Sequence, residues 1–414
     1  IIHRLEDMFL IDEGDILVTD HTDPNWEPVM KKTSAIITNQ GGRTCHAAII
    51  ARELGIPAVV GCLDATNSIQ DQSMISVSCA EGDKGFVYEG QIDYELISKN
   101  IKSLPDIGTK IMINIGNPDR AFYFAKTPNE GVGLARIEFI INRMIGIHPN
   151  AILDFQNLDE ELKVQIKEIS SGYENPREFY VAKLTEGIST IASAFYPKPV
   201  IVRLSDFKSN EYASLIGGDK FEPNEENPML GFRGASRYLN KEFQLCFKME
   251  CDAIIRTREK MGLDNIQIMI PFIRTIEEAK QSLTLLELNG LSRGKQGLKI
   301  IMMCELPSNA LMAKEFLEYF DGMSIGSNDL TQLTLGLDRD SGLVAEAFNE
   351  QNESVKKLMQ LAIQACKKEN KYIGICGQGP SDYPDFAKWL IDQEIESISL
   401  NPDSVIKTWI EISQ

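Results

Sequence analysis

The feature that most constrains the fold is a series of short apolar runs that alternate with helical segments over roughly the last 300 residues. The runs are Ile111–Gly116, Gly131–Glu138, Val200–Ser205, Gln267–Phe272, Ile301–Glu305, Gly322–Ser327, Tyr372–Gly377 and Ser397–Pro402. Helical stretches between them, such as 275–288, 308–319, 353–369 and 384–392, predict a (β/α)₈ TIM barrel over residues 108–414, with two insertions of about 60 residues.

Residues 1–92 predict a second unit of a different kind. One strong helix is expected from Cys45 to Leu54, with Gly55 as its left-handed stop. Around it, apolar runs and glycines indicate a small, β-rich α/β domain. Residues 93–107 predict a helical linker that ends at Pro105. The predicted strands are Ile16–Val18, Ala35–Thr38, Ala58–Val60, Met74–Val77 and Gly85–Tyr88.

Composition excludes several classes of function. The net charge of −18 argues against a nucleic-acid-binding or anionic-membrane surface. No apolar run approaches the roughly 18 residues that a membrane helix needs. The eight cysteines are scattered without paired zinc spacing, which indicates free thiols and a cytoplasmic location. The chain opens with Ile1 in sequence that already resembles folded protein, so we expect a fragment whose N-terminal part is missing.

The sharpest local signal surrounds His46. A predicted strand ends before Gly41-Gly42, and a helix is expected to begin next to the histidine. Glycines leave backbone amides open, and a helix N-terminus favours an anion. A neutral imidazole there can attack phosphorus, with Arg43 as a nearby cation. The alternative is an ordinary surface or capping histidine.

Two carboxylates follow neighbouring strands of the predicted barrel. Glu305 ends one apolar run, and Asp329 closes the next. Catalytic residues of such barrels lie at the carboxyl ends of strands, and Mg²⁺ prefers oxygen ligands. These residues therefore predict a magnesium site. The alternative is a pair of helix-capping acids.

Three arginines and one cysteine complete the candidate set. Arg136, Arg203 and Arg233 lie at apolar strand ends or in a glycine-bounded turn, where a guanidinium is costly unless it meets an anion. Phosphate and carboxylate are the natural partners, and structural salt bridges are the alternative. Cys376 at a strand end could serve as an acid/base for carbon, although its sequence taken alone favours a buried inert thiol. The acidic stretch 222–227 predicts a surface loop that enters the barrel mouth.

These segments resemble the phosphoenolpyruvate-utilising enzymes. The run 41–61, which contains the histidine, is similar to the phosphohistidine signature of that family. The runs 227–234 and 326–334 resemble signatures of the family's barrel. The resemblance covers nearly the whole chain and is weakest over 140–195.

The resemblance implies a role for each candidate residue. His46 would carry the phosphoryl group on a domain that swivels between two sites. Mg²⁺ would be held by Glu305 and Asp329, and Cys376 would donate or accept a proton at the methyl carbon of pyruvate. Substrate phosphate and carboxylate would be bound by Arg136 and Arg203, charge would be supported by Arg233 and Arg339, and the pyruvate pocket would be lined by Gly326, Ser327 and Asn328.

Within the family, Cys45, the run 373–382 and the run 23–30 resemble members that make phosphoenolpyruvate from pyruvate with water as second phosphoryl acceptor. That implies the reaction ATP + pyruvate + water giving AMP + phosphoenolpyruvate + phosphate, in gluconeogenesis. An ATP-grasp domain would precede the chain, and the barrel would form a homodimer. The alternatives are a pyruvate phosphate dikinase and a non-enzymatic phosphocarrier module. A lyase on a similar barrel would lack the histidine domain.

Thr44 lies two residues before the histidine. Bacterial members of the family can be inactivated by phosphorylation of this threonine, so the resemblance implies a regulatory kinase/phosphorylase. Added negative charge beside the imidazole would repel a phosphoryl donor. The alternative is that Thr44 only caps the helix.

Overall fold

The computed structural model describes residues 1–42, 45–80, 84–94, 104–105, 107–338, 341 and 344–413. The chain divides into two compact units. One comprises Ile1–Pro105 with Thr331–Glu350, and the other comprises Asp106–Leu330 with Gln351–Gln414. Most of the predicted helical linker at 93–107 lies outside the described residues.

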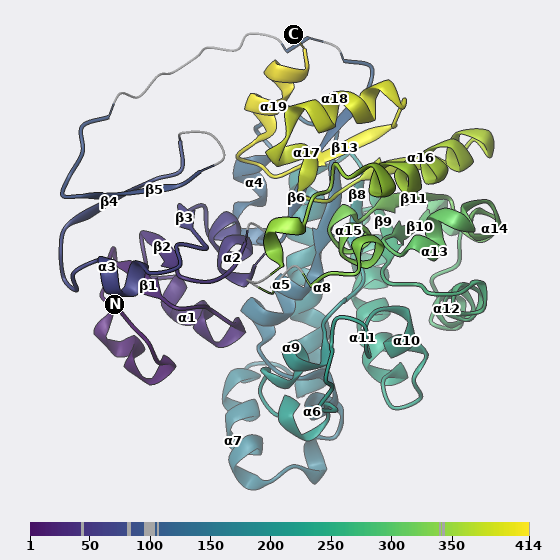
Figure 1. Ribbon diagram of the computed structural model, residues 1–414. Helices are drawn as coiled ribbons and strands as arrows, with labels where there is room; N and C mark the ends of the chain where they lie inside the picture. Colours follow the sequence, from purple (N-terminus) through teal and green to yellow (C-terminus); the bar gives the residue numbers. More distant parts are fainter. Residues whose placement is uncertain are drawn as a thin grey trace. The chain divides into compact units, whose positions relative to one another are not determined.

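The larger unit contains a closed barrel of parallel strands, as predicted (Figure 1). In the described part of the chain each strand pairs with its neighbour in sequence, and the last strand closes the ring by pairing with the first through Ser397–Lys110 to Leu400–Ile113. Nearly every strand residue is buried, which explains why the runs are mostly apolar. The strands are β6 (Lys110–Ile115), β7 (Val132–Arg136), β8 (Val200–Arg203), β9 (Ile266–Ile270), β10 (Ile300–Cys304), β11 (Gly322–Ile325), β12 (Tyr372–Ile375) and β13 (Ser397–Leu400).

Helices cover the barrel, and Figure 1 shows several of them outside the strands. In α16 (Glu353–Lys368), buried residues recur at helical spacing from Val355 to Cys366, and Asn352 caps the first turn by accepting a hydrogen bond from the Ser354 amide. No described helix combines the length and apolar character needed to cross a bilayer. The others are α4 (Ala121–Phe124), α5 (Ile137–Ile140), α6 (Pro149–Leu153), α7 (Glu160–Ile169), α8 (Pro176–Phe195), α9 (Ser209–Ala213), α10 (Ala235–Leu239), α11 (Gln244–Ile255), α12 (Ile276–Leu288), α13 (Pro307–Leu311), α14 (Ala313–Leu317), α15 (Ser327–Leu335), α17 (Gly379–Asp382), α18 (Pro384–Asp392) and α19 (Val405–Ile412).

The smaller unit contains a parallel sheet and a separate antiparallel hairpin. The sheet has the order β1-β2-β3, and Val18, Ile37 and Ala65 form part of its core. All of the predicted strands of this unit are present, as is its predicted helix. The elements are β1 (Ile16–Thr19), α1 (Glu27–Met30), β2 (Ala35–Thr38), α2 (His46–Leu54), β3 (Ala58–Val59), α3 (Ala65–Ser68), β4 (Ile75–Ser78) and β5 (Phe86–Glu89).

A buried polar network fixes the chain where it leaves β8. The carboxylate of Glu250, on α11, accepts hydrogen bonds from the Ser205 amide at 3.1 Å and from the Ser205 hydroxyl. Tyr212 donates to the same hydroxyl, and Tyr238 donates to the Ser205 carbonyl. Burial raises the pKa of Glu250 to about 7, although the bonds from Ser205 oppose that rise. Ser205 is therefore held from several sides.

The first prediction concerns Gly187, which is buried in α8. A methyl group there would lie 2.6 Å from Ile140 Cγ2. Alanine favours a helix over glycine by about 1 kcal/mol, but overpacking a core costs about 1–3 kcal/mol. Gly187→Ala should therefore lower the free energy of unfolding, measured by urea titration. Ser193→Ala, at an exposed position of the same helix, should not lower it. Equal stability of Gly187→Ala and wild type would contradict the packing.

The second prediction concerns the pH dependence of stability. The folded pKa of Glu250, about 7, lies above its unfolded value of roughly 4.3. As pH rises, the unfolded chain loses this proton first, so this contribution is full below about pH 4 and is lost by about pH 7. Glu250→Gln should remove a decline on the order of 3 kcal/mol between those limits. Urea titrations of both proteins from pH 5 to pH 8 measure the difference, and parallel pH profiles would count against a buried titrating carboxyl.

Candidate active site

His46 is the first residue of α2 and is half-buried. Cys45 precedes it with an extended backbone, and Gly55 ends the helix in the left-handed conformation, as predicted. Gly41 has φ +106°, and a Cβ there would lie 2.7 Å from Cys45 Sγ, so this turn requires glycine. Arg43 and Thr44 lie outside the described residues.

The imidazole of His46 is oriented by a residue that the sequence analysis did not select. The hydroxyl of Thr22 lies 3.1 Å from His46 Nδ1. This contact engages Nδ1, one of the two ring nitrogens. Thr22 lies 24 residues before His46, outside the glycine-rich motif around the histidine, so that motif gave no indication of it.

Glu305 directly follows β10 and is fully buried. The Phe272 amide donates to Glu305 Oε1 at 2.6 Å, whereas Oε2 has no hydrogen-bond partner among the described atoms. Burial raises the pKa of Glu305 well above its usual value, and the negative charges of Asp206 and Asp329 raise it further. Asp329 lies in the first turn of α15, beyond the strand end where it was expected.

Arg233 is buried between two acids. Its Nε and Nη2 bond the two oxygens of Asp206 at 3.0 and 2.6 Å, and its Nη1 bonds Asp329 Oδ1 at 3.0 Å. The structure thus realises the salt-bridge alternative for this arginine and brings it together with a predicted metal ligand. Asp206 was missed, although the polar pair Ser205-Asp206, one residue beyond the end of β8, is a signal that could have identified it.

Arg203, at the end of β8, joins the same network. Its Nη2 bonds Glu138 Oε1 at 2.8 Å, and its Nη1 lies 3.3 Å from Asp206 Oδ2. Arg136 is its register partner on β7. Two of the predicted arginines therefore end adjacent strands, and Glu138 is a further acid that sequence reasoning did not select.

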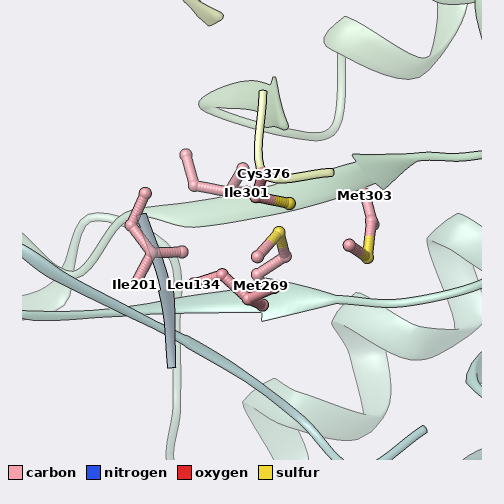
Figure 2. Close-up of a cluster of buried hydrophobic side chains, with 6 residues drawn as sticks. All are labelled: Leu134, Ile201, Met269, Ile301, Met303 and Cys376. Atoms are coloured by element: carbon pink, nitrogen blue, oxygen red, sulfur yellow. The ribbon is translucent and has the colours of Figure 1, made fainter. Parts of the chain in front are cut away.

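Cys376 follows β12 and lies among apolar side chains (Figure 2). Burial raises the pKa of its thiol to about 11, partly offset by a hydrogen bond from Ser324 Oγ at 3.3 Å. Met303 belongs to the same cluster and lies 3.8 Å from Arg203 Nη1. The cluster comprises Leu134, Ile201, Met269, Ile301, Met303 and Cys376.

The predicted pocket segment 326–328 lies beside Glu305 and beside the turn that follows Cys376. A Cβ at Gly326 would lie 3.1 Å from Glu305 Oε2, so glycine permits this close approach. Ser327 packs against Gly377, where any side chain would overlap its hydroxyl. Asn328 accepts a hydrogen bond from the Gln378 amide at 3.2 Å. Arg339 lies outside the described residues.

The donor set suits a hard divalent cation. Glu305 offers an unbonded carboxylate oxygen, and Arg233 joins Asp329 to the same charged network. Carboxyl groups at positions 138, 206, 305 and 329 meet the guanidiniums of Arg203 and Arg233, and a bound cation would offset their mutual repulsion and favour the ionised form of Glu305. Among the described residues no group of three or more acids, histidines or cysteines forms a ready-made site. Substrate and water would have to complete the shell.

Comparison with known proteins covers both units. Residues 11–82 match the family described as PEP-utilising enzyme, mobile domain, and residues 96–414 match PEP-utilising enzyme, PEP-binding domain. Phosphoenolpyruvate synthases of Escherichia coli (strain K12) and Pseudomonas aeruginosa (strain UCBPP-PA14) are 62% and 63% identical over 414 residues. Each alignment covers 100% of this chain and 52% of the relative, so the chain spans about half the length of these curated relatives.

Among solved structures, an HpcH/HpaI aldolase from Desulfitobacterium hafniense DCB-2 aligns with 73% of this chain and 90% of its own, at TM-score 0.38 and 12% identity. An HpcH/HpaI aldolase/citrate lyase family protein from Burkholderia cenocepacia J2315 covers 74% of this chain and 93% of its own, at TM-score 0.39 and 10% identity. The family matches extend over most of the sequence and include both His46 and the barrel. The chain belongs to the PEP-utilising enzyme family.

Proposed function

We propose that this chain transfers a phosphoryl group between His46 and the enolate of pyruvate, and so makes phosphoenolpyruvate. The observation that carries the proposal is the state of His46: it begins a helix, is half-buried and has Nδ1 engaged by Thr22. The names of the relatives support the substrate, and the barrel supplies the expected acidic and basic groups.

The carrier step is a substitution at phosphorus. In the direction that consumes phosphoenolpyruvate, Nε2 of His46 forms a bond to phosphorus while the bond from phosphorus to the enol oxygen breaks, and that electron pair leaves with the oxygen. A proton on Nδ1, held toward Thr22, would leave the lone pair on Nε2. The helix N-terminus would favour the transferred anion.

The arginines would bind the charged groups of the substrate. Arg136 and Arg203 end neighbouring strands in register, so their guanidiniums can take phosphate and carboxylate together. Glu138 and Asp206 hold Arg203 in a fixed orientation before substrate arrives. Glu305 and Asp329 would hold Mg²⁺, which when bound would offset charge on the enolate oxygen.

Cys376 would exchange the proton of the methyl group. With its pKa raised to about 11, the thiol is protonated near neutral pH. It is therefore suited to give its proton to the enolate carbon, and synthesis of phosphoenolpyruvate runs the same step in reverse. The surrounding apolar cluster would limit competing proton transfer from water.

The remaining parts of the reaction belong to the whole enzyme. Because the chain covers 52% of its relatives' length, we propose that a preceding ATP-grasp domain phosphorylates His46 and that the mobile domain swivels between the two sites. A homodimer, gluconeogenic use and control through Thr44 follow from the same resemblance. A dikinase would release pyrophosphate with AMP, whereas the proposed enzyme releases phosphate.

The third prediction tests the phosphoryl carrier directly. Incubated with phosphoenolpyruvate and Mg²⁺, this chain should gain one phosphoryl group on His46 and release an equal amount of pyruvate. Intact mass and peptide mapping at alkaline pH locate the group. His46→Ala should gain none, whereas His3→Ala, an exposed histidine of the same unit, should match wild type. A label that survives in His46→Ala would refute the proposal.

The fourth prediction separates proton transfer from phosphoryl transfer. Cys376→Ala should lose exchange of the pyruvate methyl protons with D₂O by about 10²-fold or more, because a positioned acid/base contributes that much. Labelling of His46 by phosphoenolpyruvate should remain detectable. Cys366→Ala, which empties a buried thiol on α16, is the control. Wild-type exchange in Cys376→Ala would assign the proton to another group.

A further inference from the structure

Phe272 lies two residues beyond β9 with φ +49° and is 1% exposed. For a bulky residue this left-handed conformation is strained, and such strain persists only where the surroundings impose it. Among the described non-glycine residues with positive φ, Phe272 is the buried one. The others are Leu63, Gln72, Gln296, Asn370 and Glu394, and all of them are exposed.

The backbone of Phe272 makes a hydrogen bond to only one of the two carboxylate oxygens of Glu305. Its amide donates to Oε1 at 2.6 Å, and Oε2 has no hydrogen-bond partner among the described atoms. Rotation about φ would turn the amide relative to the rest of the residue. The strained conformation therefore fixes which carboxylate oxygen is left for a ligand.

The neighbouring elements hold this conformation on both sides. The Ala235 amide donates to the Pro271 carbonyl at 3.2 Å, and Asn309 Nδ2 donates to the Ile273 carbonyl at 2.7 Å. The oxygen of the same Asn309 side chain accepts from the Glu305 amide at 3.1 Å. The loop after β9 is thus tied to the residue that it orients.

The ring of Phe272 meets the arginine side of the site. Arg233 Cζ lies 4.1 Å from the ring centroid, and Arg274 Cζ lies 4.8 Å from it. Both distances are within the range of a cation–π contact. Arg233 directs its nitrogens to Asp206 and Asp329, so the ring supports its remaining surface.

We propose that Phe272 is a positioning residue that orients Glu305 toward a divalent cation through its backbone. Through its ring it holds Arg233 on Asp206, the carboxylate that also orients the substrate-binding Arg203. The proposal rests on the proposed function for the identity of both ligands. It makes two separable claims, one for the backbone and one for the side chain.

An isomeric pair of variants separates the two claims. Phe272→Leu and Phe272→Ile both remove the ring, but only β-branched isoleucine resists positive φ. Mn²⁺ affinity, measured by electron paramagnetic resonance on the intact chain, should stay within about 3-fold of wild type in Phe272→Leu and fall about 10-fold in Phe272→Ile, as for other supports of a metal ligand. In both variants the phosphoenolpyruvate concentration for half-maximal His46 labelling should rise about 5-fold. Phe272→Tyr should resemble wild type in both.

A second variant tests the backbone claim independently, in case Phe272→Ile does not fold. A Cβ at Gly234 would lie 2.6 Å from Phe272 Cβ, so Gly234→Ala should also weaken Mn²⁺ binding while keeping the ring. Equal Mn²⁺ affinity in the leucine and isoleucine variants, or unchanged substrate dependence in Phe272→Leu, would overturn the proposal. Wild-type Mn²⁺ binding by Glu305→Gln would instead overturn the metal site itself, and with it this part of the proposed function.

Discussion

The organisation of the barrel mouth depends on one carboxylate, Asp206, that is shared by two buried arginines. Asp206 binds Arg233 through both oxygens and also pairs with Arg203, so neither guanidinium is buried without a counter-charge. A buried ion pair contributes little net stability, but removing one partner leaves an uncompensated charge and costs about 3–5 kcal/mol. The network therefore fixes orientation more than it stabilises the fold. Glu250, on helix α11 outside the barrel, binds Ser205, which directly precedes Asp206 in the chain. The position of Asp206 is therefore also fixed from this helix.

The fold was predictable because its strands are buried on both faces. Runs such as Ile301–Glu305 could be matched to β10 (Ile300–Cys304) because covering helices leave no polar face on a barrel strand. The helix after the double glycine could also be predicted, because the left-handed conformation that ends it is one that glycine, here Gly55, adopts readily. Asp329 was placed at a strand end but lies in α15, because polar residues after a strand are compatible with either a loop or a helix start.

Contacts between distant segments account for what the sequence could not show. Glu138 and Thr22 each act through partners many residues away, and no local pattern identifies such pairs. The stretch 222–227 was predicted to be a surface loop, and it lies outside helices and strands with Pro223, Asn224, Glu226 and Asn227 exposed. Its acidic composition did not show that the side chain of Glu222 is buried, where it bonds His148 at 2.9 Å and both terminal nitrogens of Arg237. Composition counts charges but does not report whether a partner neutralises them.

The site is divided between a charged side and an apolar side, and this division suits the proposed chemistry. Phosphoryl transfer needs fixed positive charge, which the buried arginines supply. Proton transfer to carbon needs a weak acid that keeps its proton, and burial of Cys376 among methionines and aliphatic side chains produces one. Met303 contacts both Arg203 and the thiol cluster, so the two environments meet at one side chain. An enolate bound across that boundary would present its oxygen to the charges and its carbon to the thiol, and the barrel would direct two different reactions to two ends of one small molecule.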